Sequence, residues 1–470
     1  MTRVIVVGGG LAGLTTAADL ADSGVEVLLL EKRPVLGGKV SSWEDEGGYP
    51  VESGLHIFFG CYRELLQMMR RVDAYRHVNW KDHTIHVARK GGKLSKFHFP
   101  AVPAPFNGIV AFTGNDLLTW HEKLTNVRAL IRPWLAPLDR VARWDDRTYG
   151  EWHRDYGIAE GVLTKWWNPI ALSMGFLNAN DMSARPMTTV FHHFSRSADA
   201  SQVGFLDGPP SERMHMPFER YIMGRGGEVR CDSRVAGLVV EWEEGTPSVR
   251  AVRLESGELL EADTFVVAAP LHSARQVLPG ELRAMPYFDR LWGLKSVPVM
   301  NVQVWFDRYV SEVDNLFVTA DAPFSVFADL ARTSPLYDRT GGSLVSMAVA
   351  PAAPLWHLSD DEVAQRCIES LRELWPRSRC ANIIRTSVVR IPNSIYREVP
   401  GSDALRPTQQ TPIPNLALAG DYTQQDYMAS MEGAVRSGHR AAKVLLDMPL
   451  SGPSTKSGTI KSRALSRKVR

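Results

Sequence analysis

Residues 4–39 read VIVVGGGLAGLTTAADLADSGVEVLLLEKRPVLGGK, and this stretch holds the strongest fold signal of the chain. An apolar run leads into Gly8, Gly10 and Gly13 in G-x-G-x-x-G spacing, and an Ala- and Leu-rich segment follows. A second apolar run then ends at Glu31. This order predicts strand, glycine turn, helix and strand, the arrangement that binds a dinucleotide. The glycines alone are weak evidence, because glycine also makes ordinary turns.

Each residue type in this pattern has a physical role. Glycine allows the tight turn, lets the backbone approach a pyrophosphate, and lets the helix pack closely on the sheet. The helix predicted to begin at Leu11 presents free N–H groups and a positive dipole end to phosphates. Glu31 follows at the spacing of a carboxylate that accepts ribose hydroxyls. The sequence therefore predicts a dinucleotide-binding site.

Two further segments favour FAD over NAD. Gly37-Gly38-Lys39 is a second glycine turn, and its cation can lie against phosphate or flavin, although a plain loop has the same composition. Near the other end of the chain, LALAGD (416–421) is an apolar strand that ends in Gly420 and Asp421. A carboxylate at this strand end can meet the polyol between flavin and phosphate. MEGAVRSGHRAAKVLL (431–446) then has helical periodicity, and its N-terminus can stabilise the negative charge of a reduced flavin. The alternative is a simple packing helix.

Composition indicates a large globular enzyme. The 470 residues are 44% hydrophobic and 23% charged, and the net charge of +2 gives no nucleic-acid signal. The four cysteines lie far apart without a C-x-x-C motif, so neither a disulfide framework nor a metal site is predicted. No apolar run reaches the length of a membrane span, and the fingerprint begins at residue 4, where a signal peptide would lie. We expect a cytoplasmic protein.

Two stretches suggest contact with a membrane surface. Residues 103–137 mix Phe, Trp, Leu and Ile with Lys123, Arg128 and Arg132, as in an interfacial amphipathic helix. An ordinary helix that covers a core has the same pattern. Residues 451–470 contain six Lys or Arg and no acidic residue, which predicts a disordered tail and allows a weak tether to anionic lipid.

The middle of the chain predicts a second layer. SGLHIFFGCY (53–62) is either a loop close to the flavin with aromatic side chains facing a cavity, or a core strand. Residues 229–262 read as consecutive antiparallel strands, and 266–270 as a strand that returns to the nucleotide sheet. PVMNVQVWFDR (298–308) alternates apolar and polar residues, which predicts a strand of a separate sheet beneath the substrate.

Several segments resemble one family in particular. They are VLGGK (35–39), GLHIFFG (54–60), PAPFNGI (103–109), FLDGPPSERMHMP (205–217), VPGSDALRP (399–407) and LAGDYTQQDYMASMEGAV (418–435). From residue 3 to about 446 the chain resembles the plant- and cyanobacterial-type poly-cis carotene desaturases, within the flavin amine oxidase superfamily. FLDGPPSER and REVPGSDALRP are more similar to phytoene desaturase, whereas HIFFGCY and the 176–185 region are more similar to ζ-carotene desaturase.

The resemblance implies an α/β fold with a Rossmann-like FAD-binding domain. A substrate domain with a mixed, largely antiparallel sheet and a helical segment that faces the membrane would complete it. The FAD-binding domain would comprise 1–65, 205–275 and 405–450. The substrate domain would comprise 66–204 and 276–404, with its helical part at 103–200.

The resemblance also implies site residues. Contacts with FAD would come from Gly8, Gly10, Leu11, Ala12, Gly13, Glu31, Lys32, Gly37, Gly38, Lys39, Gly54, Leu55, His56, Ile57, Tyr62, Val235, Gly420, Asp421, Met431 and Gly433. Arg213, Ala429, Phe58 and Phe59 would lie in the substrate or quinone cavity, where a guanidinium can donate to a carbonyl.

The implied reaction is the conversion of 15-cis-phytoene to ζ-carotene, with ζ-carotene as the alternative substrate. A hydride leaves an allylic carbon for the oxidised flavin and a proton leaves the neighbouring carbon, so placement in a dry channel matters more than an acid–base pair. No catalytic side chain is assigned, and a lipid-soluble quinone would re-oxidise the flavin at the membrane surface.

Three other functions stay open at this point. They are a flavin-dependent carotene isomerase, an amine-oxidase-like enzyme acting on soluble amines, and a non-catalytic lipid-binding module of the same fold. The last would not need both flavin-binding segments. Self-association into a homo-oligomer is also open.

Overall fold

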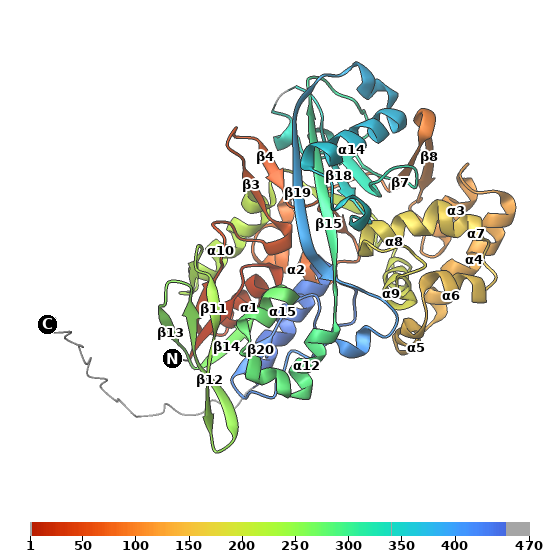
Figure 1. The fold of residues 1–470 in the computed structure, drawn as a ribbon. Helices are drawn as coiled ribbons and strands as arrows, with labels where there is room; N and C mark the ends of the chain where they lie inside the picture. Colours follow the sequence, from red (N-terminus) through yellow and green to blue (C-terminus); the bar gives the residue numbers. More distant parts are fainter. Residues whose placement is uncertain (1, 340, 448–470) are drawn as a thin grey trace.

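The computed structural model describes residues 2–339 and 341–447, so the predicted tail at 451–470 lies outside the described residues. Figure 1 shows three parts. The first, at the lower left, contains helices α1 and α15; the second is a large sheet with strands β15, β18 and β19; the third is a group of helices, α3 to α9, at the right. The labels follow Figure 1.

The first part is built on a parallel sheet of five strands in the order β10-β2-β1-β14-β20. Its strands are β1 (Arg3–Val7), β2 (Glu26–Leu30), β10 (Glu228–Arg230), β14 (Thr264–Val267) and β20 (Leu416–Leu418). Parallel strands are covered on both faces, which is why they read as apolar runs in the sequence. The strand predicted at 266–270 thus returns to this sheet, beside β1.

Helix α1 (Leu11–Asp22) is buried along most of its length, because it packs both on this sheet and against α15 (Met431–Leu446). Gly438 permits the contact between the helices, since a Cβ there would lie 2.6 Å from the carbonyl oxygen of Ala12. The Thr16 hydroxyl donates to the Gly438 carbonyl oxygen at 3.1 Å. Helix α2 (Arg63–Arg71) packs on α15.

The second part is a sheet of seven strands in the order β19-β15-β18-β17-β16-β7-β8. Its strands are β7 (Thr84–Arg89), β8 (Lys93–His98), β15 (Ser296–Phe306), β16 (Leu316–Val318), β17 (Val326–Asp329), β18 (Leu344–Val349) and β19 (Ile383–Tyr396). All neighbours are antiparallel except β16 and β7. The predicted strand at 298–308 is therefore confirmed.

The alternation in β15 has a structural reason. Met300, Val302 and Val304 join a core with helix α14 (Asp360–Leu374), which covers one face of the sheet. Val299 and Asn301 line a cavity, which Met300 between them also borders. Successive side chains of a strand point to opposite faces, so this sheet has one face for its own core and one for a site.

Smaller sheets complete the strands. Of the antiparallel strands predicted at 229–262, the structure has β11 (Val235–Glu243), β12 (Thr246–Leu254) and β13 (Leu259–Glu261). The others are β3 (Ser42–Glu44) with β4 (Pro50–Glu52), and β5 (Phe58–Phe59) with β9 (Val203–Leu206) and β6 (Val78–Trp80). The prediction is wrong at 229–230, which belong to β10 and pair parallel with β2.

The predicted helical segment forms the third part. Its helices are α3 (Phe106–Gly114), α4 (Trp120–Leu135), α5 (Leu138–Arg143), α6 (Tyr149–Asp155), α7 (Glu160–Val162), α8 (Asn168–Gly175) and α9 (Ala184–Phe194). The remaining helices are α10 (Met216–Met223), α11 (Leu271–Val277), α12 (Pro286–Gly293) and α13 (Leu330–Thr333). Within the described residues, none of the helices has both the length and the apolar character needed to span a membrane.

His153 on α6 lies in the aromatic core of the helical part. Its ring is 4.6 Å from that of Tyr149 and also packs on Trp152 and Trp167. Neither ring nitrogen has a hydrogen-bond partner, and burial lowers the pKa of His153 to about 3. The folded protein therefore keeps this imidazole neutral at acidic pH.

We expect the free energy of unfolding to fall as the pH decreases from 6.5 toward 4. In this range an unfolded histidine binds a proton that folded His153 does not, which costs about 1.4 kcal/mol per pH unit. His86, His193 and His215, whose pKa values burial lowers to about 4, contribute in the same direction. His153→Phe should reduce this slope by about one proton in denaturant titrations at several pH values. The same change at the exposed His357 should not, and an unaltered slope in His153→Phe would contradict the assignment.

Candidate active site

One cavity of about 890 Å³ extends from the nucleotide sheet, past the seven-stranded sheet, to the helical part. At one end it is lined by the two glycine turns and Glu31. At the other end its lining includes Phe112, Trp166 and Phe191. A cavity with polar groups at one end and largely apolar walls elsewhere is typical of a cofactor and substrate site.

The first glycine turn is shaped by backbone contacts that no side chain could share. Gly8 has φ +115°, and a Cβ there would lie 2.7 Å from the carbonyl oxygen of Ala268. At Gly13 a Cβ would lie 1.9 Å from the carbonyl oxygen of Gly8. Gly10 is different, because it lines the cavity and a Cβ there would come no nearer than 3.8 Å to Gly38. A side chain at Gly10 would thus occupy the cavity rather than disturb the fold.

Gly10 is also the N-cap residue of α1, and no side chain caps this helix. The first N–H groups of the helix, at Leu11 and Ala12, belong to residues that line the cavity. Free N–H groups and the positive end of the helix dipole make this position suited to a phosphate group.

Glu31 lies directly after β2 and is 5% exposed. Its Oε2 accepts the N–H of Gly9 at 2.8 Å, and its Oε1 accepts the N–H of Arg33 at 3.1 Å. These bonds fix the carboxylate at the cavity wall, and each oxygen keeps a lone pair for a ribose hydroxyl.

The second glycine turn is attached directly to the first. Gly37 N–H donates to the Gly9 carbonyl oxygen at 2.8 Å, and a Cβ on Gly38 would lie 3.1 Å from Gly10 Cα. Behind Gly37, His215 leaves no room for a side chain. Burial lowers the pKa of His215 to about 4, and its neutral ring donates from Nε2 to the Val40 carbonyl oxygen at 2.7 Å.

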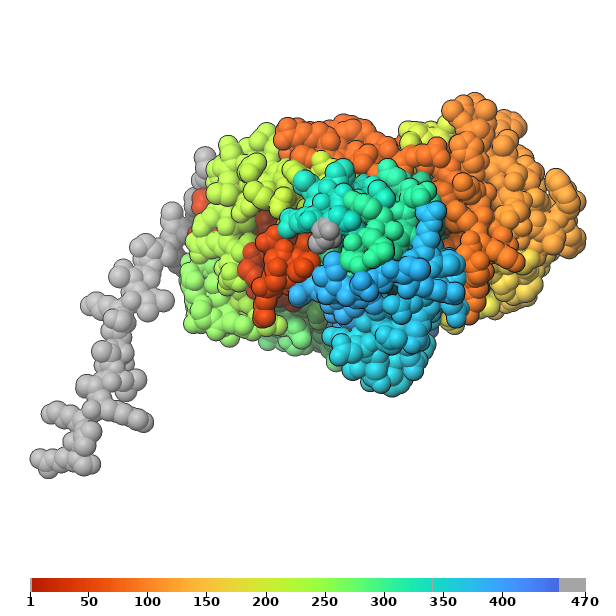
Figure 2. Space-filling view, turned by 90° about the horizontal axis from the view of Figure 1, so that it is seen from above, coloured from red at the N-terminus to blue at the C-terminus, as the bar shows by residue number. Residues whose placement is uncertain are grey.

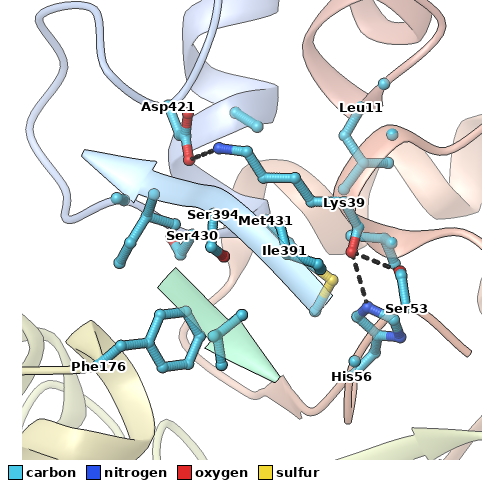
Figure 3. A pocket seen from close by; sticks show the side chains of 18 of the residues that line it. Leu11, Lys39, Ser53, His56, Phe176, Ile391, Ser394, Asp421, Ser430 and Met431 are labelled. Atoms are coloured by element: carbon cyan, nitrogen blue, oxygen red, sulfur yellow. Dashed lines mark hydrogen bonds and ion pairs between the residues drawn. The ribbon is translucent and has the colours of Figure 1, made fainter. Parts of the chain in front are cut away.

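The two ends of the chain meet at an ion pair. Lys39 Nζ lies 2.7 Å from Asp421 Oδ2, although 382 residues separate them in the sequence. Figure 3 shows this pair across the cavity from Phe176. Lys39 was predicted to lie against phosphate or flavin; it lines the cavity but its charge is paired with Asp421. Asp421 follows the end of β20. The residue before it, Gly420, donates its N–H to Ser437 Oγ on α15 at 2.8 Å.

Most of the predicted site residues line this one cavity. They are Gly8, Gly10, Leu11, Ala12, Glu31, Lys32, Gly37, Gly38, Lys39, Gly54, Leu55, His56, Ile57, Phe59, Tyr62, Val235, Gly420, Asp421, Ala429 and Met431.

Four predicted residues lie outside the lining. Phe58 is fully buried in β5 and pairs with Gly204 of β9, so the core-strand alternative holds for this side chain, whereas the adjacent Phe59 faces the cavity. Arg213 lies in a π-helical turn (Ser211–His215) and its Nε is 3.2 Å from Asp207 Oδ1. Neither residue is among those that line the cavity, and their role in binding substrate or quinone stays a prediction.

Gly13 and Gly433 support the cavity from behind. Gly13 packs α1 on the first turn, and a Cβ on Gly433 would lie 2.5 Å from the Met428 carbonyl oxygen. At both positions the structure explains the glycine by the close backbone contact that it allows.

Other lining residues were not predicted. They include Trp43, Ser53, Asn107, Phe112, Trp166, Met174, Phe176, Phe191, Phe194, Asn301, Ile391 and Ser394. Ser53 is the best defined of them, because its Oγ donates to the Lys39 carbonyl oxygen at 2.8 Å (Figure 3). Its position directly before GLHIFFG was the signal that could have found it. The aromatic residues of the helical part had no comparable signal.

These features define an FAD-binding oxidoreductase in which segments from both ends of the chain line one cavity. Residues 11–446 match the family described as flavin containing amine oxidoreductase, and the chain belongs to this family. The glycine turns, the open N-terminus of α1, Glu31 and Asp421 fit FAD. The predicted fold class and cofactor are confirmed.

Known relatives align with nearly the whole length of this chain. A probable zeta-carotene desaturase from Synechococcus elongatus is 39% identical and covers 95% of this chain and 98% of its own length. A 15-cis-phytoene desaturase from the same organism is 35% identical, with 94% and 96% covered.

Solved structures share the fold at low identity. An oxidoreductase from Methanosarcina mazei gives a TM-score of 0.72 at 17% identity and covers 94% of this chain and 100% of its own. Wild-type putrescine oxidase bound to putrescine gives 0.64 at 17% identity, with 95% and 99% covered.

Gly10→Val should fold but purify without flavin. The valine has room within the protein and would fill the space of the pyrophosphate. The ratio of absorbance at about 450 nm to that at 280 nm reports bound flavin, and thermal unfolding reports the fold. Gly280→Val is the matched control, because Gly280 is exposed and a Cβ added there would have no atom within 4 Å. Full flavin content in Gly10→Val would contradict the assignment of the space beside Gly10 to the pyrophosphate.

Proposed function

We propose that this chain is an FAD-dependent desaturase of a poly-cis carotene. The observation that carries the proposal is that one cavity extends from the glycine turns, where a dinucleotide can bind, to a largely apolar end in the helical part. The similarity to carotene desaturases over 94–95% of the chain supports it. 15-cis-Phytoene is the substrate that the sequence favours. ζ-Carotene is the second candidate, because the zeta-carotene desaturase is 39% identical and the phytoene desaturase from the same organism 35%.

The residues of the chain have defined tasks in such a reaction. When bound, the flavin supplies the acceptor for a hydride from an allylic carbon. Aromatic and aliphatic side chains such as Phe176, Phe191 and Ile391 hold the polyene and exclude water. The backbone of 428–431 borders the same space, and the N–H of Ala429 is fixed by donation to Glu398 Oε1 at 3.2 Å. A rigid, dry wall keeps the reacting carbon within the short distance that the transfer needs.

The holoenzyme should desaturate a carotene when substrate is supplied in lipid with a quinone. Separate incubations with 15-cis-phytoene and ζ-carotene, followed by product spectra, distinguish the two candidates. Conversion of phytoene to ζ-carotene supports the first assignment, and conversion of ζ-carotene alone supports the second. Flavin-containing protein that converts neither, but oxidises a soluble amine, would overturn the proposal.

The same proposal includes a membrane surface as the source of substrate and quinone. The helical part exposes seven large apolar side chains, which we call the apolar helical patch. They are Val102, Phe106, Val110, Trp120, Leu124, Leu135 and Leu138. Trp120 and Leu124 are 69% and 70% exposed, and Arg128, Arg132 and Arg140 lie in the same segment. Such a mixture of apolar and basic residues suits the interface of an anionic bilayer.

The apolar helical patch and the cavity share one wall. On α3, Phe106 and Val110 are exposed, whereas Asn107, Gly108 and Phe112 line the cavity. Figure 2 shows the helical segment, in orange and yellow, as one end of the elongated molecule. A lipid-soluble molecule would therefore need to cross only the thickness of one helix between bilayer and cavity, and a quinone acceptor would use the same route.

Leu124→Glu should weaken binding to anionic vesicles by about tenfold or more, because one fully inserted leucine contributes about 1.5–3 kcal/mol. Co-sedimentation with vesicles of phosphatidylglycerol and phosphatidylcholine measures the effect. Leu259→Glu is the matched control, since Leu259 is 57% exposed on β13, away from the apolar helical patch. Equal binding by the two variants would contradict the proposal that the apolar helical patch binds the membrane.

A further inference from the structure

Phe176 has an unusual backbone conformation at the C-terminal end of helix α8. Its φ is +57° and its ψ is +19°, in the left-handed region. There the Cβ of an L residue crowds the following carbonyl oxygen, so glycine, asparagine and aspartate are the residues that usually adopt this backbone. A phenylalanine in the left-handed region is strained, and glycine in its place would remove the strain.

The other left-handed positions have ordinary explanations. Within residues 2–339 and 341–447, the other non-glycine residues with a positive φ are Asp73, Asp232 and Glu244. Aspartate tolerates this backbone, and Glu244 lies in the exposed turn between β11 and β12. These three residues do not line the cavity, whereas Phe176 does. The one bulky side chain with a left-handed backbone therefore lies at the candidate active site.

The surrounding chain holds Phe176 in this conformation. The glycine before it, Gly175, is needed for another reason, because a Cβ there would lie 2.5 Å from Met182 Cε. The left-handed turn thus falls on the next residue, Phe176. Beyond it, the Ala179 N–H donates to Asn168 Oδ1 at 2.8 Å and fixes the returning chain to the start of α8. A strained residue persists only where its surroundings hold it in this way.

The ring of Phe176 is placed where a ligand can touch it. Ile170, Ser173 and Met174 of α8 also line the cavity, so one face of this helix borders the cavity and Phe176 follows at its end. The ring packs against the core but is only partly buried. Figure 3 shows it pointing into the cavity, on the opposite side from Lys39.

We propose that Phe176 is a substrate-positioning residue, and that its strained backbone is kept because it directs the ring against the polyene beside the cofactor. The inference rests on the proposed FAD-dependent desaturation and names a side chain that fixes which part of the substrate reacts. A carotene has no polar group, so only contacts with apolar side chains can fix its position along the cavity. Hydride transfer needs the reacting carbon about 3–3.5 Å from its acceptor, and a small displacement slows it strongly.

The first test compares the flavin-containing Phe176→Gly protein with the wild type. Anaerobic mixing with a carotene in lipid, followed at about 450 nm, gives the rate of flavin reduction. At saturating substrate this rate should fall about tenfold to hundredfold, because the polyene is no longer held in place, while the flavin content stays the same. Glu244→Gly is the matched control, since it also replaces a left-handed residue by glycine but lies away from the cavity. It should be reduced at the wild-type rate.

Chemical denaturation tests the strain itself. Phe176→Gly and Phe176→Ala both lack the ring, but glycine accepts the left-handed backbone and alanine does not. At a fixed denaturant concentration the ratio of folded to unfolded protein should be about fivefold higher for the glycine variant. Phe176→Leu gives a further measurement if either variant does not fold. It keeps an apolar side chain at the same position and should be reduced faster than Phe176→Gly.

Each result separates one part of the inference from the others. A folded, flavin-containing Phe176→Gly protein that is reduced at the wild-type rate overturns the positioning role. An alanine variant as stable as the glycine variant overturns the strain. A wild-type holoenzyme whose flavin is reduced by neither phytoene nor ζ-carotene would instead overturn the proposed function, and the positioning of a polyene with it. The comparison of the glycine and alanine variants needs no substrate and is decided independently.

Discussion

Helices α1 and α15 come from the two ends of the chain and touch at Gly438, where a single methyl group would lie 2.6 Å from the Ala12 carbonyl oxygen. The cavity depends on this close approach. It brings the end of β20 toward the first glycine turn, so that Asp421 can reach Lys39. The interior is close-packed, and a larger residue at Gly438 would separate the two ends that hold the cofactor. The binding site is in this sense a product of helix packing.

The nucleotide-binding half could be predicted because its signals are local. Buried parallel strands read as short apolar runs, and the residues at their ends point to one edge of the sheet. Gly8, Gly13 and Gly37 each occupy a place where a Cβ would meet backbone or ring atoms, so glycine at these positions reflects geometry alone. Asp421 could be placed for the same reason, since it follows the last strand of that sheet. The pairing of Asp421 with Lys39 could not be predicted, because it depends on tertiary structure.

The substrate half was less predictable, since its signals are not local. In FF (58–59) the two rings point to opposite sides of a short strand, and the sequence does not say which side holds the cavity. Phe112, Trp166 and Phe191 come from different helices, and each has the composition of an ordinary core residue. Arg213 has a guanidinium like that of any site arginine, but in the structure it pairs with Asp207 at 3.2 Å and is not among the residues that line the cavity.

The distribution of polar groups in the cavity bears on what it can hold. An unpaired buried polar group costs about 1–3 kcal/mol, so an apolar ligand placed over such groups would bind poorly. Here the polar groups gather at the glycine turns, where a dinucleotide can satisfy them, while the helical end presents aromatic and aliphatic side chains. Arg390 shows the same separation within one residue, because its guanidinium bonds to groups outside the cavity. The chamber can therefore accept a long apolar molecule without stripping water from unpaired polar groups, while the charged contacts remain with the cofactor.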